Sequence, residues 1–170
     1  MAIAPGASLP VHKFQAIKGG KKFDMSTKEI FAGKTVALFA VPGAFTPTCH
    51  RKHLPDFVAH LDEFAASGVD TVACLSVNDS YVMAEWAKAS GDGGRMLFLA
   101  DGSGTFTKAI GLDTDLDKYG MGVRSARYAM LVEDGVVTVL NVEPKSGEAT
   151  QSGAEALLQS LPASKAKKTG

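Results

Sequence analysis

The sequence predicts a single α/β domain in which helices cover both faces of a mixed β-sheet. Buried-strand patterns alternate with helical patterns through the middle of the chain, as expected for parallel strands joined by helices. Two β-rich runs then meet at Asp134-Gly135, a dipeptide that favours a tight antiparallel hairpin. With 170 residues, of which 45% are hydrophobic, the chain can bury one core without disulfides or metals.

The first clear strand is TVALFAV, residues 35–41, which is apolar on both faces and therefore predicts a central strand. Pro42 and Gly43 end it. Apolar side chains three and four apart between Leu54 and Ala65 then predict one helix, over residues 46–68, that ends at Gly68.

Pro55 lies inside this predicted helix and cannot donate a hydrogen bond to the carbonyl of Arg51. We expect it to bend the helix without ending it. The helix should begin near Thr46 to Thr48, which places Cys49 in its first turn.

The remaining elements follow from the same patterns, with an Asn/Asp cap before the second helix. They are a strand at 69–77, a helix at 78–91, a strand at 96–100, a short helix at 103–110, the hairpin at 126–143 and a closing helix at 153–161. We assign residues 1–163 to one domain and residues 164–170 to a flexible Lys-rich tail.

Composition disfavours several classes of partner. Eighteen basic residues balance eighteen acidic ones, so no global field attracts nucleic acid or an anionic membrane. Residues 1–10 lack the basic start and apolar centre of a signal peptide, and the longest uncharged run, 35–50, is too short to span a bilayer. We expect a cytoplasmic protein in which Cys49 and Cys74, the only cysteines, are not a disulfide framework.

Cys49 is the strongest candidate for chemistry. A thiol with a pKa of about 8.5 is only a few per cent ionised at neutral pH, and the first turn of a helix favours the thiolate. Lowering a thiol pKa by about 2.5 units takes about 3.4 kcal/mol, whereas a helix terminus supplies about 0.3–2 kcal/mol. A further cation is therefore expected near Cys49.

Three neighbours of Cys49 have two readings each. Thr46 stands one turn before the sulfur and can bond it, although Thr46 or Thr48 can equally be the helix cap. His50 and His53 are nearby cations and suggest a metal site, but zinc usually needs three or four ligands. We therefore expect both histidines to be exposed polar residues of the helix, and no metal.

The sequence VPGAFTPTC, followed by HLPDF, resembles the active-site segment of the peroxiredoxins, whose pattern falls here on Pro42, Thr46 and Cys49. The stretches ACLSVND, EW, RYAM and LNVEP resemble the type II, peroxiredoxin-5-like members in the same order. This resemblance covers nearly the whole chain. It implies a thioredoxin-like fold and the reduction of hydrogen peroxide and organic hydroperoxides, with a role in antioxidant defence and redox homeostasis.

The resemblance also implies roles for the site residues. Cys49 would be the peroxidatic nucleophile and would become a sulfenic acid. Thr46 would bond the sulfur and the peroxide oxygen, and the Cys49 N–H would steady the peroxide. Pro42 would shield the thiolate from water, and Gly43 would lie against the substrate.

An arginine completes the family's site, and VRSARYAM offers Arg124 and Arg127. On one strand, a separation of three residues sends them to opposite faces, so only one can face Cys49. The match to RY before an apolar strand selects Arg127, which would stabilise the charge on the leaving oxygen. Arg124 would pair on the surface or take a secondary part.

Cys74 lies in the middle of a predicted strand, where a free cysteine usually packs as a small apolar residue. It remains a possible resolving cysteine, although bridging to Cys49 would require local unfolding. The favoured alternative is resolution by an external thiol, from glutaredoxin with glutathione or from thioredoxin, with no cofactor. The resemblance further implies a homodimer through the loops beside the site, with GAF and the segment after Val77 as its surface.

Two rival functions stay open on the sequence. A thioredoxin-type disulfide oxidoreductase is disfavoured because position 46 is Thr, so the Cys-x-x-Cys motif is missing. A redox-sensing or chaperone-like protein would use Cys49 oxidation as a signal. That reading leaves the set of Pro42, Thr46 and Arg127 without a purpose.

Overall fold

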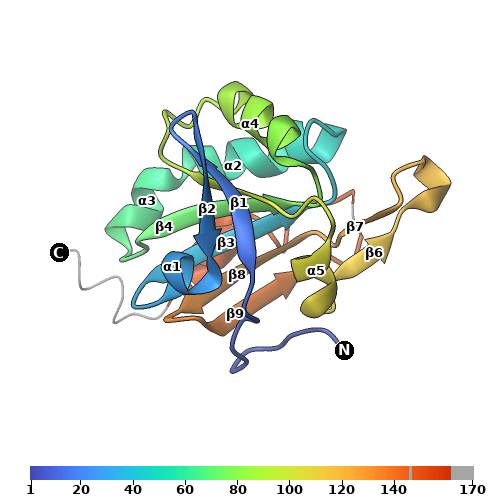
Figure 1. Cartoon of the computed structure of the whole chain (residues 1–170). Coiled ribbons are helices and arrows are strands. Elements are labelled where there is room, and N and C mark those ends of the chain that lie inside the picture. Colours follow the sequence, from blue (N-terminus) through green and yellow to red (C-terminus); the bar gives the residue numbers. More distant parts are fainter. Residues whose placement is uncertain (146, 162–170) are drawn as a thin grey trace.

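The computed structural model describes residues 1–145 and 147–161, so the predicted tail at 164–170 lies outside the described residues. Seven strands form one mixed sheet in the order β2-β1-β5-β4-β3-β8-β9 (Figure 1). The strands are β1 (Lys13–Lys18), β2 (Lys21–Ser26), β3 (Thr35–Val41), β4 (Thr71–Ser76), β5 (Leu97–Ala100), β8 (Tyr128–Glu133) and β9 (Val136–Val142). The predicted α/β class with a mixed sheet is confirmed.

The centre of the sheet consists of β3, β4 and β5, which run parallel to one another. β8 lies antiparallel against β3, and β9 returns antiparallel along β8. The turn between them uses Asp134 and Gly135 with φ angles of 49° and 79°, the left-handed conformation that a tight hairpin requires. The hairpin prediction is confirmed.

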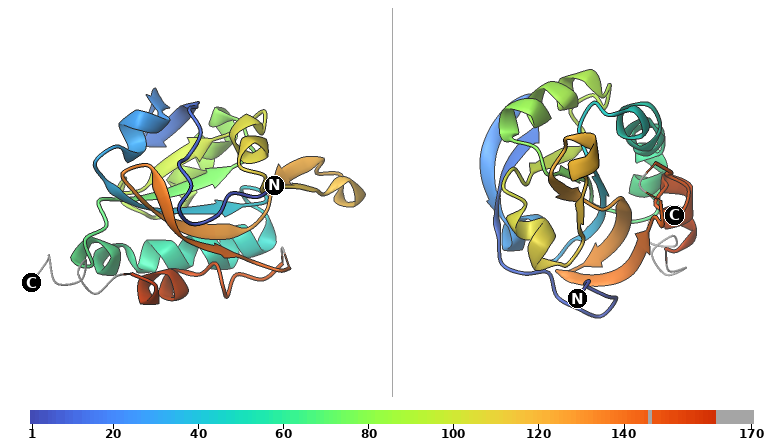
Figure 2. Two further views of the ribbon diagram at one scale, coloured as in Figure 1. Left: turned by 90° about the horizontal axis from the view of Figure 1, so that it is seen from below. Right: turned by 90° about the vertical axis from the view of Figure 1, so that its right-hand side faces the viewer.

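Helices cover both faces of the sheet (Figures 1 and 2). One face carries α2 (Leu54–Ala59), α3 (Leu61–Ala66), α4 (Ser80–Ala89) and α6 (Ala154–Gln159), and the other carries α1 (Thr27–Phe31) and α5 (Thr105–Ala109). In the first layer the ring of Phe57 stacks on Phe39 of β3 with centroids 4.0 Å apart. Cys49 and Cys74 are both buried in this same layer.

The single helix predicted over 46–68 is wrong in its continuity. The helix begins at Pro47, close to the predicted start, passes into the π-helical turn η1 (Cys49–His53), continues as α2 and breaks at His60 before α3. Because Pro55 has no N–H, the α-helical pattern of backbone hydrogen bonds is interrupted just before it. The N–H of Leu54 instead donates to the carbonyl of Cys49, five residues back. The other predicted elements are present, with ends shifted by no more than two residues.

Several elements were not predicted from the sequence. The hairpin of β1 and β2, joined at Gly19-Gly20, forms one edge of the sheet, and α1 follows it with a capping box of Ser26 and Glu29. Both features have sequence signals that point to them. A small ribbon of β6 (Asp113–Asp115) and β7 (Val123–Ser125), with the 3₁₀ turn η2 (Asp117–Tyr119), projects from the body (Figure 2).

Within the described ranges, the longest helix has ten residues, and none is long and apolar enough to cross a bilayer.

Candidate active site

Cys49 lies where the central strand β3 gives way to η1, at the carboxyl edge of the parallel strands. Its side chain is fully buried, and Pro42 and Gly43, which join β3 to this loop, are buried as well. The N–H of Ala44 donates to Oδ1 of Asn78 at 2.9 Å, so the loop is tied to the segment after β4. The loop that leads to Cys49 is therefore held at the ends of two neighbouring strands, β3 and β4.

Arg127 brings positive charge to the sulfur. Its Nη2 donates to Cys49 Sγ at 3.0 Å, and the residue is only 2% exposed. Because β8 is antiparallel to β3, with Tyr128 opposite Ala40, the residue before β8 lies at the edge where β3 ends. This pairing brings together two residues that are 78 positions apart.

Arg124 lies on β7 and contacts the backbone of the loop that joins β3 to η1. Its Nη1 donates to the carbonyl of Pro42 at 3.3 Å, and its Nε donates to the carbonyl of Met121 at 2.9 Å. Arg127 therefore contacts the sulfur, while Arg124 braces the backbone beside it. Gly43 lies between these parts: a Cβ placed there would lie 3.0 Å from Arg124 Nη1 and 3.0 Å from Thr46 Cγ2.

Thr46 uses its hydroxyl proton locally. Its Oγ1 donates to the carbonyl of Gly43 at 2.6 Å, which leaves the oxygen lone pairs to face other groups. A hydroxyl held in this way can accept a hydrogen bond from a hydroperoxide. Thr48 makes no side-chain cap, because its Oγ1 donates to the carbonyl of Gly147 at 3.0 Å.

The expectation that both histidines are exposed is wrong for His53, which is fully buried. Its Nε2 lies 2.8 Å from the carbonyl oxygen of Ser152 and its Nδ1 lies 3.0 Å from Nη1 of Arg127. Burial, and secondly the charge of Arg127, lower the pKa of His53 to about 4. His50 is half-buried and accepts a hydrogen bond from Nε1 of Trp86 at 3.0 Å.

The described part of the chain holds no cluster of three His, Cys, Asp or Glu side chains that could bind a metal ion. Cys74 sits in β4 opposite Phe39, fully buried, and both cysteines are free thiols. Burial, and secondly the nearby Cys49, raise the pKa of Cys74 well above its ordinary value. Cys74 is therefore held as a neutral thiol on the side of the sheet that faces Cys49.

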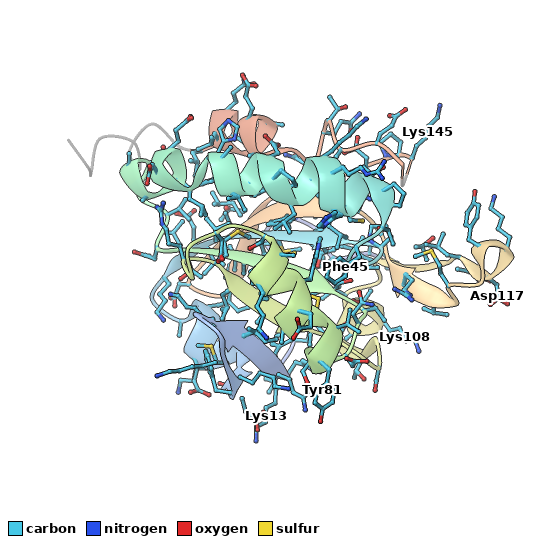
Figure 3. All side chains as sticks on the ribbon, turned by 90° about the horizontal axis from the view of Figure 1, so that it is seen from above. Lys13, Phe45, Tyr81, Lys108, Asp117 and Lys145 are labelled. Atoms are coloured by element: carbon cyan, nitrogen blue, oxygen red, sulfur yellow. The ribbon has the colours of Figure 1, made fainter. Side chains whose placement is uncertain are left out.

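Phe45 is the exposed aromatic residue of the site. It is 47% exposed and has a φ of 63°, a left-handed conformation that costs an L-residue about 1–2 kcal/mol. Its ring lies 5.4 Å from that of His50, and Figure 3 labels it near α4 and the helical segment that follows the site.

Known proteins are similar to this chain over nearly its whole length. The family described as Redoxin matches residues 4–158. Peroxiredoxin-2C from Oryza sativa subsp. japonica is 45% identical over 160 residues, which cover 94% of this chain and 98% of that protein.

Solved structures are also similar to this chain over nearly its whole length. Reduced Prx3 in complex with H₂O₂ from Vibrio vulnificus has a TM-score of 0.86 and 47% identity, over 94% of this chain and 99% of that one. A structure named as a putative thioredoxin reductase from Burkholderia cenocepacia has a TM-score of 0.89 and 40% identity, over 96% of this chain and 100% of that one.

Proposed function

Because the chain belongs to the peroxiredoxins of the redoxin family, and is therefore a peroxidase, we propose that Cys49 is its reacting residue. The type II subfamily fits the relatives found. The thiolate of Cys49 attacks one oxygen of a hydroperoxide, so that an S–O bond forms and the O–O bond breaks. Sulfur loses two electrons and becomes a sulfenic acid, and the departing oxygen takes a proton to leave as water or an alcohol.

One observation carries this proposal: the buried contact of 3.0 Å between Arg127 Nη2 and Cys49 Sγ. A guanidinium at this distance donates a charge-assisted hydrogen bond to the sulfur. It also lies beside the oxygen on which negative charge develops as the O–O bond breaks. Charge stabilisation of this kind acts strongly here, because both residues are shielded from water.

We assign the remaining positions of the motif to holding the peroxide. Thr46 accepts a hydrogen bond from the hydroperoxide O–H, since its own proton points to Gly43. The N–H of Cys49 steadies the peroxide oxygen, and buried Pro42 excludes bulk water from the sulfur. Gly43 leaves the room that a substrate needs, because any side chain there would meet Thr46 and Arg124.

The direct test is peroxide consumption by the wild type and Cys49→Ser, with glutathione plus glutaredoxin and separately with thioredoxin. The proposal predicts turnover in the wild type with at least one reductant and none in Cys49→Ser. Peroxide consumption that persists in Cys49→Ser, or none by the wild type with either reductant, would refute it. Cys74→Ser is the matched control, because it removes the only other thiol.

We propose that an external thiol resolves the sulfenic acid. A first thiol displaces the hydroxyl as water to form a mixed disulfide, and a second thiol releases Cys49. The buried position and raised pKa of Cys74 support this route, since a neutral thiol is a poor nucleophile.

Cys74→Ser is accordingly expected to keep turnover with glutaredoxin and glutathione, or with thioredoxin, close to that of the wild type. The measurement is the steady-state rate of peroxide loss, with circular dichroism to verify folding. A folded variant that lost nearly all turnover would identify Cys74 as the resolving residue instead.

We also propose a homodimer that forms through the loops beside the site. Exposed Phe45 and its strained backbone support this surface, and Asn78 after β4 joins it through its bond to Ala44. A cytoplasmic location stays a prediction, because similar proteins carry the names chloroplastic and mitochondrial. Cell fractionation with an antibody to the native protein would test it.

A further inference from the structure

Arg127 is held by a closed set of hydrogen bonds that reaches the segment after β9. Its Nη1 contacts Nδ1 of His53 at 3.0 Å, and His53 Nε2 contacts the carbonyl of Ser152 at 2.8 Å. A carbonyl oxygen only accepts, so Nε2 carries the proton. In the neutral ring that a pKa of about 4 implies, Nδ1 therefore has a free lone pair and accepts from Arg127.

The hydrogen bonds continue from Ser152 to the carboxylate of Glu143. Ser152 donates to Oε2 of Glu143 twice, from its N–H at 2.8 Å and from its hydroxyl at 2.7 Å. The N–H of Glu143 in turn donates to the backbone carbonyl of Arg127 at 2.9 Å. The backbone and the guanidinium of Arg127 are thus both tied to this segment.

All four members are withdrawn from water. His53 and Ser152 are fully buried, Arg127 is 2% exposed and Glu143 is 6% exposed. The ring of His53 is further fixed between apolar neighbours, since Phe39 and Phe57 lie 4.9 Å and 5.5 Å from it, centroid to centroid. Burying a histidine and a carboxylate is costly unless their bonds are made, and here each polar group has a partner.

We propose that His53 and Glu143 are positioning residues that hold the Arg127 guanidinium against Cys49 Sγ, an inference that rests on the proposed role of Cys49. Neither residue touches the sulfur in the contacts described. His53 orients Nη1, which aims Nη2 of the same planar group at the sulfur. Glu143 keeps Ser152 where its carbonyl fixes the tautomer of His53, as the outer hydrogen-bond partner of a metal-bound histidine does.

The test compares His53→Gln, which keeps an acceptor and a donor, with His53→Leu, which keeps the volume and loses both. His60→Gln is the matched control, because His60 contacts Asp56 and Glu63 rather than the site. The first readout is the rate of the stoichiometric reaction with hydrogen peroxide, followed by fluorescence of Trp86, the only tryptophan. The second readout is thiolate absorbance as a function of pH.

We expect His53→Leu to slow the reaction about tenfold to a hundredfold, the range set by losing one charged hydrogen bond. The same variant should form the thiolate only at higher pH. His53→Gln should stay within a few-fold of the wild type, and Glu143→Gln should shift both readouts in the direction of His53→Leu. A merely structural role would lower the melting temperature and leave the pH of thiolate formation unchanged.

The inference fails if folded His53→Leu reacts at the wild-type rate with unchanged thiolate formation. If that variant does not fold, Glu143→Gln decides by the same criteria. A wild type without Cys49-dependent peroxide reaction would refute the proposed function. The thiolate titration would still test the positioning of Arg127, so the two failures are distinguishable.

Discussion

Single side chains set the charge balance around the sulfur. Arg127 supplies the positive charge within 3.0 Å of Cys49, and His53 remains neutral beside it. A charged imidazole at this place would repel the guanidinium and could not accept its hydrogen bond. The neutrality of His53 is therefore part of what keeps Arg127 pointed at Cys49.

This neutrality predicts a pH dependence of stability. Below about pH 6.5 the unfolded chain binds a proton at His53, whereas the folded chain does so only near pH 4. The free energy of unfolding should therefore fall as pH drops through this window, by about 3 kcal/mol in total from this group. His53→Gln lacks the titration and should lose correspondingly less.

Urea unfolding of the wild type and His53→Gln at several pH values across the window measures the difference. Arg127, Cys49 and Glu143, the charged or titratable groups around the ring, are the same in both proteins, so His53 is the group under test. Parallel pH profiles for the two proteins would contradict the prediction.

Gly43 gives a second prediction at the residue scale. In Gly43→Ala the new Cβ would lie 3.0 Å from Arg124 Nη1 and from Thr46 Cγ2, so the loop must shift. Such overpacking costs about 1–3 kcal/mol. We expect slower peroxide turnover, because Thr46 loses its geometry toward the substrate.

Gly147→Ala is the matched control, since a Cβ there meets nothing within 4 Å. Turnover of each variant, measured with the same reductant, provides the comparison. Equal turnover by Gly43→Ala and the wild type would show that the close packing at Gly43 has no functional role.

Among the elements, η1 is the one whose stability bears on the catalytic cycle. It holds Cys49 fully buried by a π-helical turn, a rarer and weaker arrangement than the α-helix. In the proposed cycle an external thiol reaches the oxidised sulfur, which requires this turn to open. Pro55 favours opening, because it removes a ladder hydrogen bond just beyond the turn.

We expect amide hydrogen exchange in residues 48–53 to be faster after oxidation of Cys49 than before it. The oxygen of the proposed sulfenic acid would disturb a packed site in which Arg127 already lies 3.0 Å from the sulfur. Exchange measured by mass spectrometry on the reduced and the peroxide-treated protein tests this, with α5 as the internal reference. The prediction is wrong if both forms exchange at the same rate.

For the whole molecule, the proposed dimer would form through the exposed face beside the site. Phe45 stays 47% exposed, although its ring lies 6.3 Å from that of Trp86 on α4 (Figure 3). A strained, exposed aromatic residue is better explained by a partner surface than by packing within one chain. The chain's neutral net charge places no barrier against self-association.

Phe45→Glu is therefore expected to shift the proposed dimer to monomer, because it places a charge in an apolar contact. Sedimentation velocity across a range of concentrations gives the measurement. Phe23→Glu is the control, since Phe23 is similarly exposed but lies on the edge strand β2. A wild type that stays monomeric at all concentrations would rule out the dimer.

The amino-acid sequence by itself determined the sheet centre, the hairpin at Asp134-Gly135 and the placing of Cys49 in a first helical turn. These depend on local periodicity and turn chemistry, which neighbouring residues carry. Only the tertiary structure decided that the helix after Cys49 opens into a π turn, and that His53 is buried. The antiparallel pairing of β8 with β3 brings Arg127 to the sulfur, and the return of the chain after β9 brings Ser152 to His53. Contacts between residues so far apart depend on the packing of the whole sheet, which no local pattern encodes.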